Sequence, residues 1–201
     1  MPSNLTPRIK LYPEGSAMPA VEPGWLALAQ LPQPAGRSAV FGDGSHPTTR
    51  LCAAAVDLLC RQRQPRAVLD VGTGTGVLAR IARARGVGFI AGTDIDRLAL
   101  SSATAHSSLD AHPLGIHFGT ESPDHWGARF DLVVANILEA PLEELAPALS
   151  RALLPRGVLL LSGFTRPQTP ALRVLYEQIG LTFISVSHLD EWALLMFERQ
   201  D

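Results

Sequence analysis

The chain reads Asp-Val-Gly-Thr-Gly-Thr-Gly from Asp70 to Gly76, and this stretch decides the predicted fold. An apolar run precedes it and a helical pattern follows it, so the stretch is interpreted as a turn between a buried strand and a helix. Gly72, Gly74 and Gly76 allow a tight turn and the close approach of a ligand, and the N-terminus of the helix offers free N–H groups to an anion. The dinucleotide fingerprint G-x-G-x-x-G requires a glycine at position 77, where Val77 stands. The stretch therefore predicts a ligand-binding turn that differs from the dinucleotide type, with an ordinary strand–turn–helix as the alternative.

Strand and helix patterns alternate outward from this turn. Strands are predicted at Ala67–Val71, Phe89–Thr93, Ile116–Gly119, Phe130–Ala135, Val158–Ser162, Thr182–Ser187 and Glu191–Glu198. Helices are predicted from Pro47 through Leu59 and at Val77–Arg85, Arg97–Ser107, Leu142–Leu154 and Pro170–Ile179. The alternation implies right-handed crossovers and parallel strands, whereas the last two strands have no helix between them and should pair antiparallel. The predicted fold class is α/β: a Rossmann-like seven-stranded sheet, mainly parallel with an antiparallel C-terminal hairpin, as in class I S-adenosylmethionine-dependent methyltransferases.

The first forty residues differ from the rest of the chain. They contain seven prolines and little periodicity beyond a short apolar patch, Trp25–Leu31. Such a segment is expected to be extended or irregular and to follow the edge of the domain. The predicted organisation is therefore a proline-rich N-terminal segment, residues 1–40, and a catalytic domain, residues 41–201.

The overall composition is that of a globular protein and excludes some function classes. The 17 basic and 19 acidic residues nearly cancel, which does not favour a general role in nucleic-acid or membrane binding. No charged leader with an apolar core opens the chain, and no apolar run is long enough to span a membrane. Cys52 and Cys60 are expected to be reduced, buried side chains two helical turns apart. We therefore expect a soluble cytoplasmic protein with no direct nucleic-acid or membrane partner.

Acidic residues at predicted strand ends indicate an adenosine ligand. Asp94 ends the second predicted strand, 22 residues after Gly72, where a carboxylate can accept hydrogen bonds from both ribose hydroxyls. Both NAD and S-adenosylmethionine carry such a ribose, so Asp94 does not distinguish between these two cofactors. Asp96 is better explained as a solvated acid at a helix N-terminus. For Asp70 two interpretations stay open: it holds the ammonium group of the cofactor, or it stabilises the turn.

Asn136 follows the predicted strand Phe130–Ala135 and should point into the same crevice, because ligands bind beyond the carboxyl ends of parallel strands. Its amide oxygen can accept a hydrogen bond from an incoming amine and leave the nitrogen lone pair free to attack. The alternative is a strand-end asparagine that caps the next turn. Ile137 and Leu138 follow it, without the proline pair and aromatic residue typical of enzymes that methylate nucleic-acid bases. The pattern favours an amine of a protein or of a small molecule as the group that is methylated.

Several segments resemble one family of bacterial enzymes. The segment Phe41–Arg50, Phe-Gly-Asp-Gly-Ser-His-Pro-Thr-Thr-Arg, closely resembles the F-G-T-G-T-H-P-T-T segment of the PrmA family, the methyltransferases of the ribosomal large-subunit stalk protein. Further matches follow in the family's order. They are Leu69–Gly72, Thr93–Asp96, Val133–Leu138, Leu145–Pro147, Leu161–Gly163 and Glu191–Trp192. The resemblance runs from about Phe41 to the C-terminus.

The resemblance implies S-adenosyl-L-methionine as the cofactor, with contacts at Thr49, Gly72, Asp94 and Asn136. It also implies that Phe41 and His46 belong to the loop that lines the cofactor pocket. We expect His46 to be a structural anchor at a helix start, with a role as catalytic base as the alternative. Asp43 and Ser45 replace threonines of the family signature, and both are small and polar.

The expected activity is transfer of a methyl group to a protein amine, either a lysine side chain or an α-amino group, with Asn136 as the catalytic residue. The expected partner is a ribosomal large-subunit protein. Family members carry an N-terminal substrate-recognition domain, whereas only about forty proline-rich residues precede the signature here, which leaves the acceptor open. No metal site is expected, because a sulfonium methyl donor requires none. The alternatives are an enzyme of the same fold that methylates a small molecule or a different protein, a non-catalytic cofactor-binding module, and a nicotinamide enzyme.

Overall fold

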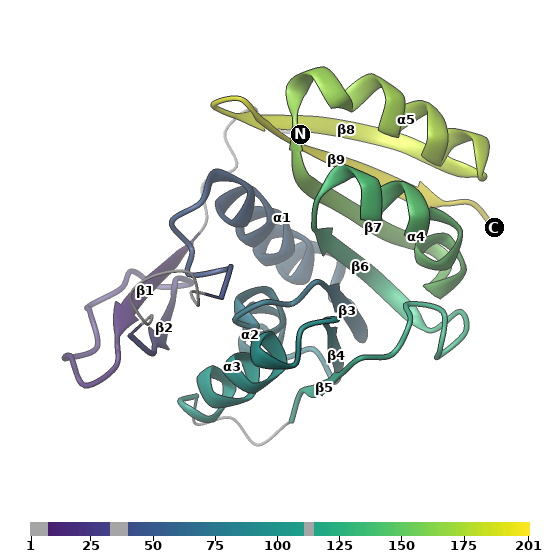
Figure 1. Cartoon of the computed structure of the whole chain (residues 1–201). Helices are drawn as coiled ribbons and strands as arrows, with labels where there is room; N and C mark the ends of the chain where they lie inside the picture. Colours follow the sequence, from purple (N-terminus) through teal and green to yellow (C-terminus); the bar gives the residue numbers. More distant parts are fainter. Residues whose placement is uncertain (1–7, 33–39, 111–114) are drawn as a thin grey trace.

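A computed structural model describes residues 8–32, 40–110 and 115–201. Its main feature is a seven-stranded sheet with the strand order β5-β4-β3-β6-β7-β9-β8 (Figure 1). The strands are β3 (Ala67–Val71), β4 (Phe89–Thr93), β5 (His117–Gly119), β6 (Phe130–Asn136), β7 (Leu153–Thr165), β8 (Leu181–Leu189) and β9 (Trp192–Arg199). The pairs among β3 to β7 are parallel, and β9 runs antiparallel to both β7 and β8. The predicted mainly parallel sheet with its antiparallel hairpin is confirmed.

Helices cover both faces of this sheet. They are α1 (Pro47–Arg63), α2 (Val77–Ala84), α3 (Arg97–Ser108), α4 (Glu139–Ala152) and α5 (Thr169–Gln178), with a 3₁₀ turn η1 (Arg166–Gln168) before α5. Successive residues of β6 alternate between two cores: Leu132 and Val134 pack with α1 and α2, whereas Val133 packs with α4 and α5. A strand that is buried on both faces carries apolar side chains on both, which explains the continuous apolar run in the sequence.

The predicted boundary between α4 and β7 is wrong by several residues. The helix was expected to reach Leu154, but it ends at Ala152 and the chain continues directly into β7. Leu153 pairs with Phe130 at the start of β6, so β7 begins five residues before the predicted Val158. The apolar residues at 153–154 suit either a helix or a strand, and the pairing of Leu153 with Phe130 places them in the strand.

The N-terminal segment is more ordered than the sequence predicts. β1 (Ile9–Pro13) and β2 (Leu26–Gln30) form a separate two-stranded parallel sheet, here called the ribbon. Leu28 of β2 is buried in the core shared with α1 and α2. β1 and β2 are extended, as the sequence predicts, but their pairing and their packing on the domain were not predicted. Residues 1–7 and 33–39 of the segment lie outside the described residues.

Two arginines of the α2 region fasten the ribbon to the main domain. Arg80 Nη2 donates a hydrogen bond to the carbonyl of Ala29 at 2.6 Å, and Arg85 Nη2 donates to the carbonyl of Gly24 at 2.7 Å. Arg85 also contacts the buried carboxylate of Asp57 in α1. The ribbon thus shares both a core and polar contacts with the domain that was predicted to begin at residue 41.

The structure also describes the two cysteines and the length and apolarity of the helices. Cys52 and Cys60 are buried and unpaired, as expected, and burial raises the pKa of the Cys60 thiol to about 12. Across residues 8–32, 40–110 and 115–201, no helix is both long enough and apolar enough to cross a membrane.

Candidate active site

The glycine turn joins β3 to α2 in a conformation that requires glycine. Gly72, Gly74 and Gly76 have φ angles of +68°, +54° and +77°, which side chains strongly disfavour. A Cβ atom on Gly72 would lie 2.1 Å from Ile137 Cγ2, and one on Gly74 would lie 2.2 Å from the carbonyl oxygen of Phe41. Gly76 caps α2 without a side-chain hydrogen bond. The N-cap therefore contributes no side-chain acceptor, although Asp70 accepts a hydrogen bond from the Ala79 amide in the first turn of α2, and the start of this helix suits an anionic ligand group.

Asp70, at the end of β3, is buried and uses its two carboxylate oxygens differently. Oδ2 accepts hydrogen bonds from the hydroxyl of Thr73 at 2.7 Å and from the amide of Ala79 at 3.2 Å. Oδ1 is buried and has no hydrogen-bond partner among the described residues. Burial is the main cause that raises the pKa of Asp70 to about 6, and the nearby charge of Asp94 acts in the same direction. One oxygen therefore stabilises the turn, as one interpretation held, and the other is left for a donor such as an ammonium group.

Asp94 connects the end of β4 to the glycine turn. Its Oδ2 accepts a hydrogen bond from the amide of Gly74 at 3.1 Å, and its Oδ1 accepts from the amide of Asp96 at 2.9 Å. Each carboxylate oxygen keeps further acceptor capacity for ribose hydroxyls. Asp96 accepts a hydrogen bond from the amide of Leu98 at 2.8 Å and caps α3, which confirms its interpretation as an acid at a helix N-terminus.

Asn136 ends β6 beside the glycine turn. Val71 pairs with Ala135, so the next residues along these parallel strands, Gly72 and Asn136, lie next to one another. The amide oxygen Oδ1 of Asn136 is buried and has no partner among the described residues. Leu138 stands at the start of α4, which has no side-chain cap. Asn136 is thus an unpaired acceptor in the crevice, and its alternative interpretation as a cap of the next turn is wrong.

The signature loop, residues 41–49, lies on the glycine turn and is fastened to it by Thr75. The amide of Thr75 donates to the carbonyl of Phe41 at 3.0 Å, and its hydroxyl donates to the carbonyl of Gly42 at 2.6 Å. The side chain of Phe41, at the start of this loop, is half exposed to solvent. Thr49, in the first turn of α1, is 1% exposed, and its Oγ1 has no partner among the described residues.

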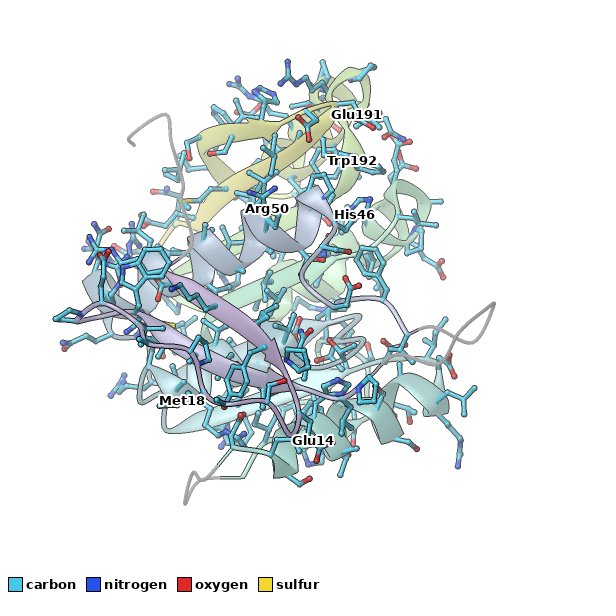
Figure 2. All side chains as sticks on the ribbon, turned by 90° about the vertical axis from the view of Figure 1, so that its left-hand side faces the viewer. Glu14, Met18, His46, Arg50, Glu191 and Trp192 are labelled. Carbon is cyan, nitrogen blue, oxygen red and sulfur yellow. The ribbon has the colours of Figure 1, made fainter. Side chains whose placement is uncertain are left out.

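His46 is the N-cap of α1. Its Nδ1 accepts from the amide of Thr48 at 3.3 Å and lies 2.8 Å from the Thr48 hydroxyl. When the ring is neutral, its proton is therefore on Nε2, which leaves that nitrogen without a lone pair for a base. The ring contacts Phe41 edge-on, with a centroid separation of 5.2 Å. It also contacts Trp192 edge-on at 4.6 Å, and Figure 2 shows these two side chains close together. These contacts support the structural-anchor interpretation.

The structure thus brings most of the predicted site residues together along one edge of the sheet. Strand order places Asn136, Gly72 and Asp94 at the ends of the adjacent strands β6, β3 and β4: Asn136 is the last residue of β6, and Gly72 and Asp94 directly follow β3 and β4. Sequence reasoning missed the fastening role of Thr75, although its place inside the glycine stretch was a signal that could have found it. Trp192 entered only as part of a resemblance, and its contact with His46 depends on the pairing of Trp192 with Thr165 across β7 and β9.

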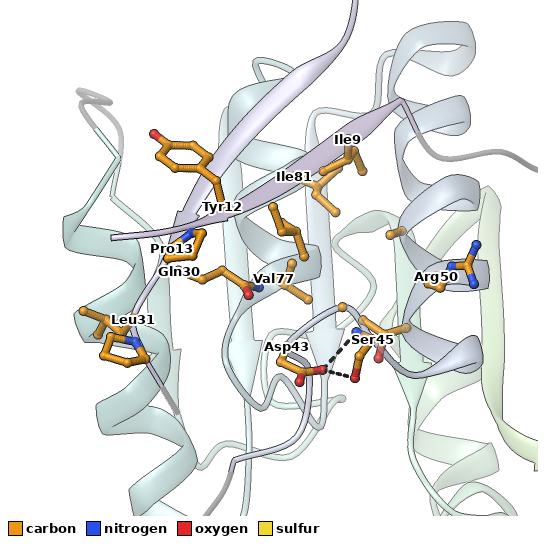
Figure 3. A pocket seen from close by; sticks show the side chains of 15 residues that line it. Ile9, Tyr12, Pro13, Gln30, Leu31, Asp43, Ser45, Arg50, Val77 and Ile81 are labelled. Carbon is orange, nitrogen blue, oxygen red and sulfur yellow. Dashed lines mark hydrogen bonds between the residues drawn. The ribbon is translucent and has the colours of Figure 1, made fainter. Parts of the chain in front are cut away.

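A groove of about 670 Å³ lies next to this site. It is bounded by β1 of the ribbon, the loop Asp43–Ser45 and the first turns of α1 and α2 (Figure 3). Asp43 Oδ1 accepts hydrogen bonds from the amide and hydroxyl of Ser45 at 2.9 and 2.7 Å, so the two departures from the family signature hold the loop together. Of the predicted site residues only Thr49 lines the groove, which is therefore beside the strand-end site rather than part of it.

Solved structures share this architecture. A ribosomal protein L11 methylase from Lactobacillus delbrueckii subsp. bulgaricus superposes with a TM-score of 0.84 at 26% identity and covers 98% of both chains. The N-methyltransferase NodS from Bradyrhizobium japonicum, in complex with S-adenosyl-L-homocysteine, superposes with a TM-score of 0.63 over 83% of this chain and 94% of its own. At 16% identity the second likeness shows the class I methyltransferase fold alone.

Sequence relatives identify the family. Proteins named ribosomal protein L11 methyltransferase are 37% identical in Caulobacter sp. over 80% of this chain and 36% identical in Syntrophotalea carbinolica over 90% of it. The matched regions span 57% and 60% of those relatives, so the chain corresponds to little more than half of their length. The family model described as ribosomal protein L11 methyltransferase (PrmA) matches residues 36–200. The chain belongs to this PrmA family.

Proposed function

We propose that this chain binds S-adenosyl-L-methionine at the strand-end site and transfers its methyl group to an amine of ribosomal protein L11. The observation that carries the proposal is a pair of buried acceptors with no partner among the described residues: Asp70 Oδ1, two residues before Gly72, and Asn136 Oδ1, at the end of the neighbouring strand β6. Buried polar atoms without partners are uncommon in proteins and call for a partner such as a ligand group or an ordered water. Membership of the PrmA family names the class of ligand that such groups would meet.

The residues present fit this cofactor. The start of α2, where the N-cap Gly76 has no side chain, suits the carboxylate of the methionine portion, and Asp70 Oδ1 suits its ammonium group. Asp94 suits the ribose hydroxyls, since both of its oxygens lie at the surface of the crevice and keep acceptor capacity. Thr49 Oγ1 supplies a further buried group beside the signature loop. The predicted cofactor contacts are thus supported by the polar groups available at each position.

The chain's own residues would then act mainly by positioning. Bound S-adenosyl-L-methionine supplies a methyl group on a sulfonium sulfur, which is a good leaving group. Asn136 Oδ1 accepts a hydrogen bond from an N–H of the acceptor, which orients an amine that reaches the site as the free base. The signature loop, fastened to the glycine turn by Thr75, keeps water away from the reacting atoms. No side chain is required as a nucleophile.

The acceptor is proposed from the names of the relatives, which describe methyltransferases of ribosomal protein L11. An amine acceptor also fits the lone amide oxygen of Asn136, which accepts a hydrogen bond and donates none. We place this activity in the cytoplasm, where ribosomal proteins are made. A small-molecule acceptor, or another protein, would use the same site residues.

The proposal is tested by incubating the protein with S-adenosyl-L-methionine labelled in its methyl group and purified ribosomal protein L11. We expect label to enter L11, and we expect Asn136→Ala to lower kcat on the order of 10²-fold through loss of positioning. Gln200→Ala, which removes an exposed amide near the C-terminus, is the matched control and should leave the rate unchanged.

The outcomes separate the parts of the proposal. Label that enters a different protein or a small molecule from a cell lysate, but never L11, would overturn the acceptor and keep the chemistry. Calorimetric titration with S-adenosylhomocysteine and with NAD tests the cofactor separately, and binding of NAD alone would contradict it. An unchanged rate in Asn136→Ala would remove that residue from the catalytic role.

A further inference from the structure

The groove of about 670 Å³ beside the strand-end site is bordered by the ribbon, which the proposed chemistry does not use. We propose that this groove binds an extended segment of the acceptor protein, which pairs with the outer edge of β1 as an added strand and delivers its amine to Asn136. This inference rests on the proposed function and deepens it, because it assigns the surface that recognises the acceptor.

The floor of the groove is apolar, and its size suits a ligand of several residues. Ala53, Val77 and Ile81, from α1 and α2, are buried at its base, and Ile9 and Leu11 line it from β1 (Figure 3). Its volume lies within the range of about 300–1,000 Å³ that is common for binding sites in proteins. An apolar side chain of a bound segment would therefore be removed from water on this floor.

The main chain of β1 borders the groove, and not only one of its faces. Leu11, Tyr12 and Pro13 are consecutive, and all three line the groove. Because successive side chains of a strand point to opposite faces, one face alone would contribute alternate residues. β2 contributes only its last residue, Gln30, so the edge at the groove is the edge of β1 that faces away from β2.

That edge carries main-chain groups that are available for pairing. The amide of Glu14, directly after β1, donates to the carbonyl of Gln30 at 2.7 Å. The hydrogen bonds of a parallel pair involve alternate residues of each strand, so the even-numbered residues of β1 bond to β2. The amides and carbonyls of Ile9 and Leu11 point the other way and have no partner among the described residues. An unpaired edge of this kind is a template for an added strand.

The groove is continuous with the strand-end site, which favours the acceptor as its occupant. Thr49 lines the groove and is also a predicted cofactor contact; it is 1% exposed, and its Oγ1 has no partner among residues 8–32, 40–110 and 115–201. Residues 43–45 of the signature loop line the groove, and Gly42 directly before them is bound by Thr75 of the glycine turn. A segment in the groove therefore lies next to the place where the methyl group is transferred.

The signature loop also fixes the position of β1 relative to the site. A Cβ atom on Gly44 would lie 2.2 Å from Leu11 Cδ1, so the loop contacts β1 directly while it lies on the glycine turn. Main-chain pairing supplies affinity for any extended segment, and the floor selects among alternate side chains of that segment. The groove thus fits a protein segment, which has a main chain to pair, better than a free small-molecule amine.

The first test measures methyl transfer to purified ribosomal protein L11 by a variant whose groove is filled. Figure 3 shows the side chain of Gln30 directed toward Val77, so Gln30→Trp places a large side chain in the groove. We expect KM for L11 to rise by about 10-fold or more, while kcat and the affinity for S-adenosylhomocysteine are unchanged. Ala27→Trp, on the opposite face of β2, is the matched control and should keep the KM of the wild type.

Amide hydrogen exchange of the full chain, followed by NMR, tests strand pairing without a substitution. With S-adenosylhomocysteine bound, addition of L11 should slow exchange at Ile9 and Leu11 by about 10-fold or more. The amides of Lys10 and Tyr12, which bond to β2, should change little. If L11 gives no protection at Ile9 and Leu11, the added strand is ruled out. Protection that grows with protein concentration in the absence of L11 would assign the edge to a second copy of this chain instead.

The outcomes separate this inference from the proposed function. If the wild-type protein methylates L11 and Gln30→Trp has the same KM, the role of the groove is refuted and the proposed function stands. If the wild-type protein never methylates L11, the proposed acceptor fails, and the inference fails with it.

Discussion

The buried carboxylate of Asp70 predicts a specific dependence of stability on pH in the free protein. Burial is the main cause that raises its pKa from 3.8 to about 6. Because the folded pKa lies above the unfolded one, the stabilising contribution is complete below about pH 4 and is lost as pH rises through 6. A difference of about 2 pKa units corresponds to about 3 kcal/mol, of which about 2 kcal/mol falls between pH 4.5 and 7.5.

Asp70→Asn removes this titration while keeping an amide oxygen for the Thr73 hydroxyl and the Ala79 amide. Urea unfolding of both proteins at several pH values, without ligand, isolates the contribution of Asp70, because all other titrating groups are common to the pair. We expect the free energy of unfolding of the variant to gain about 2 kcal/mol relative to wild type between pH 4.5 and 7.5. A difference that does not change with pH would refute the assignment of a raised pKa to Asp70.

Three further substitutions test other features. Asp94→Ala should lower the affinity for S-adenosylhomocysteine by about 1–3 kcal/mol in calorimetry, because ribose hydroxyls lose their acceptor; unchanged affinity would mean that the ribose lies elsewhere. Gly163→Ala should destabilise the fold by more than about 2 kcal/mol in urea unfolding, since its φ is +98° and its Cβ would lie 2.1 Å from the Ile137 carbonyl oxygen. Arg80→Met should cost about 1.5–3 kcal/mol, because it removes buried hydrogen bonds to Asp110 and to the Ala29 carbonyl while Asp110 keeps its pair with Arg83. Arg151→Met, at a pair whose arginine is 60% exposed, should cost at most about 1 kcal/mol. Equal losses of unfolding free energy in the two arginine variants would contradict this difference between a buried and an exposed ion pair.

The sheet and most of the site could be predicted from the sequence because their signals are local. A run of apolar residues buried on both faces predicts a parallel strand, and parallel strands place their final residues at one edge. Asp94 and Asn136 are therefore neighbours of the glycine turn by topology alone. Gly163 was quoted only for its resemblance to a family motif, and its positive φ and its contact with the Ile137 carbonyl supply the physical reason for a glycine.

The ribbon could not be predicted for reasons of tertiary context. β1 and β2 are five residues each, and their pairing is stabilised by packing on α1 and α2 that no pattern within residues 1–40 reveals.

The way in which Arg80 and Arg85 hold the ribbon has a consequence for how this chain tolerates change. Both guanidinium groups bind main-chain carbonyls, at Ala29 and Gly24, and a carbonyl is present whichever amino acid occupies the position. A substitution at position 29 that preserves the backbone path can leave its contact intact, whereas Gly24 has a φ of +84° that disfavours any side chain. Neither arginine can be replaced by a shorter or uncharged side chain without loss of its contact. The polar contacts of the ribbon thus depend on side chains of α2 and of the residue that follows it, whereas its apolar attachment depends on its own buried Leu28.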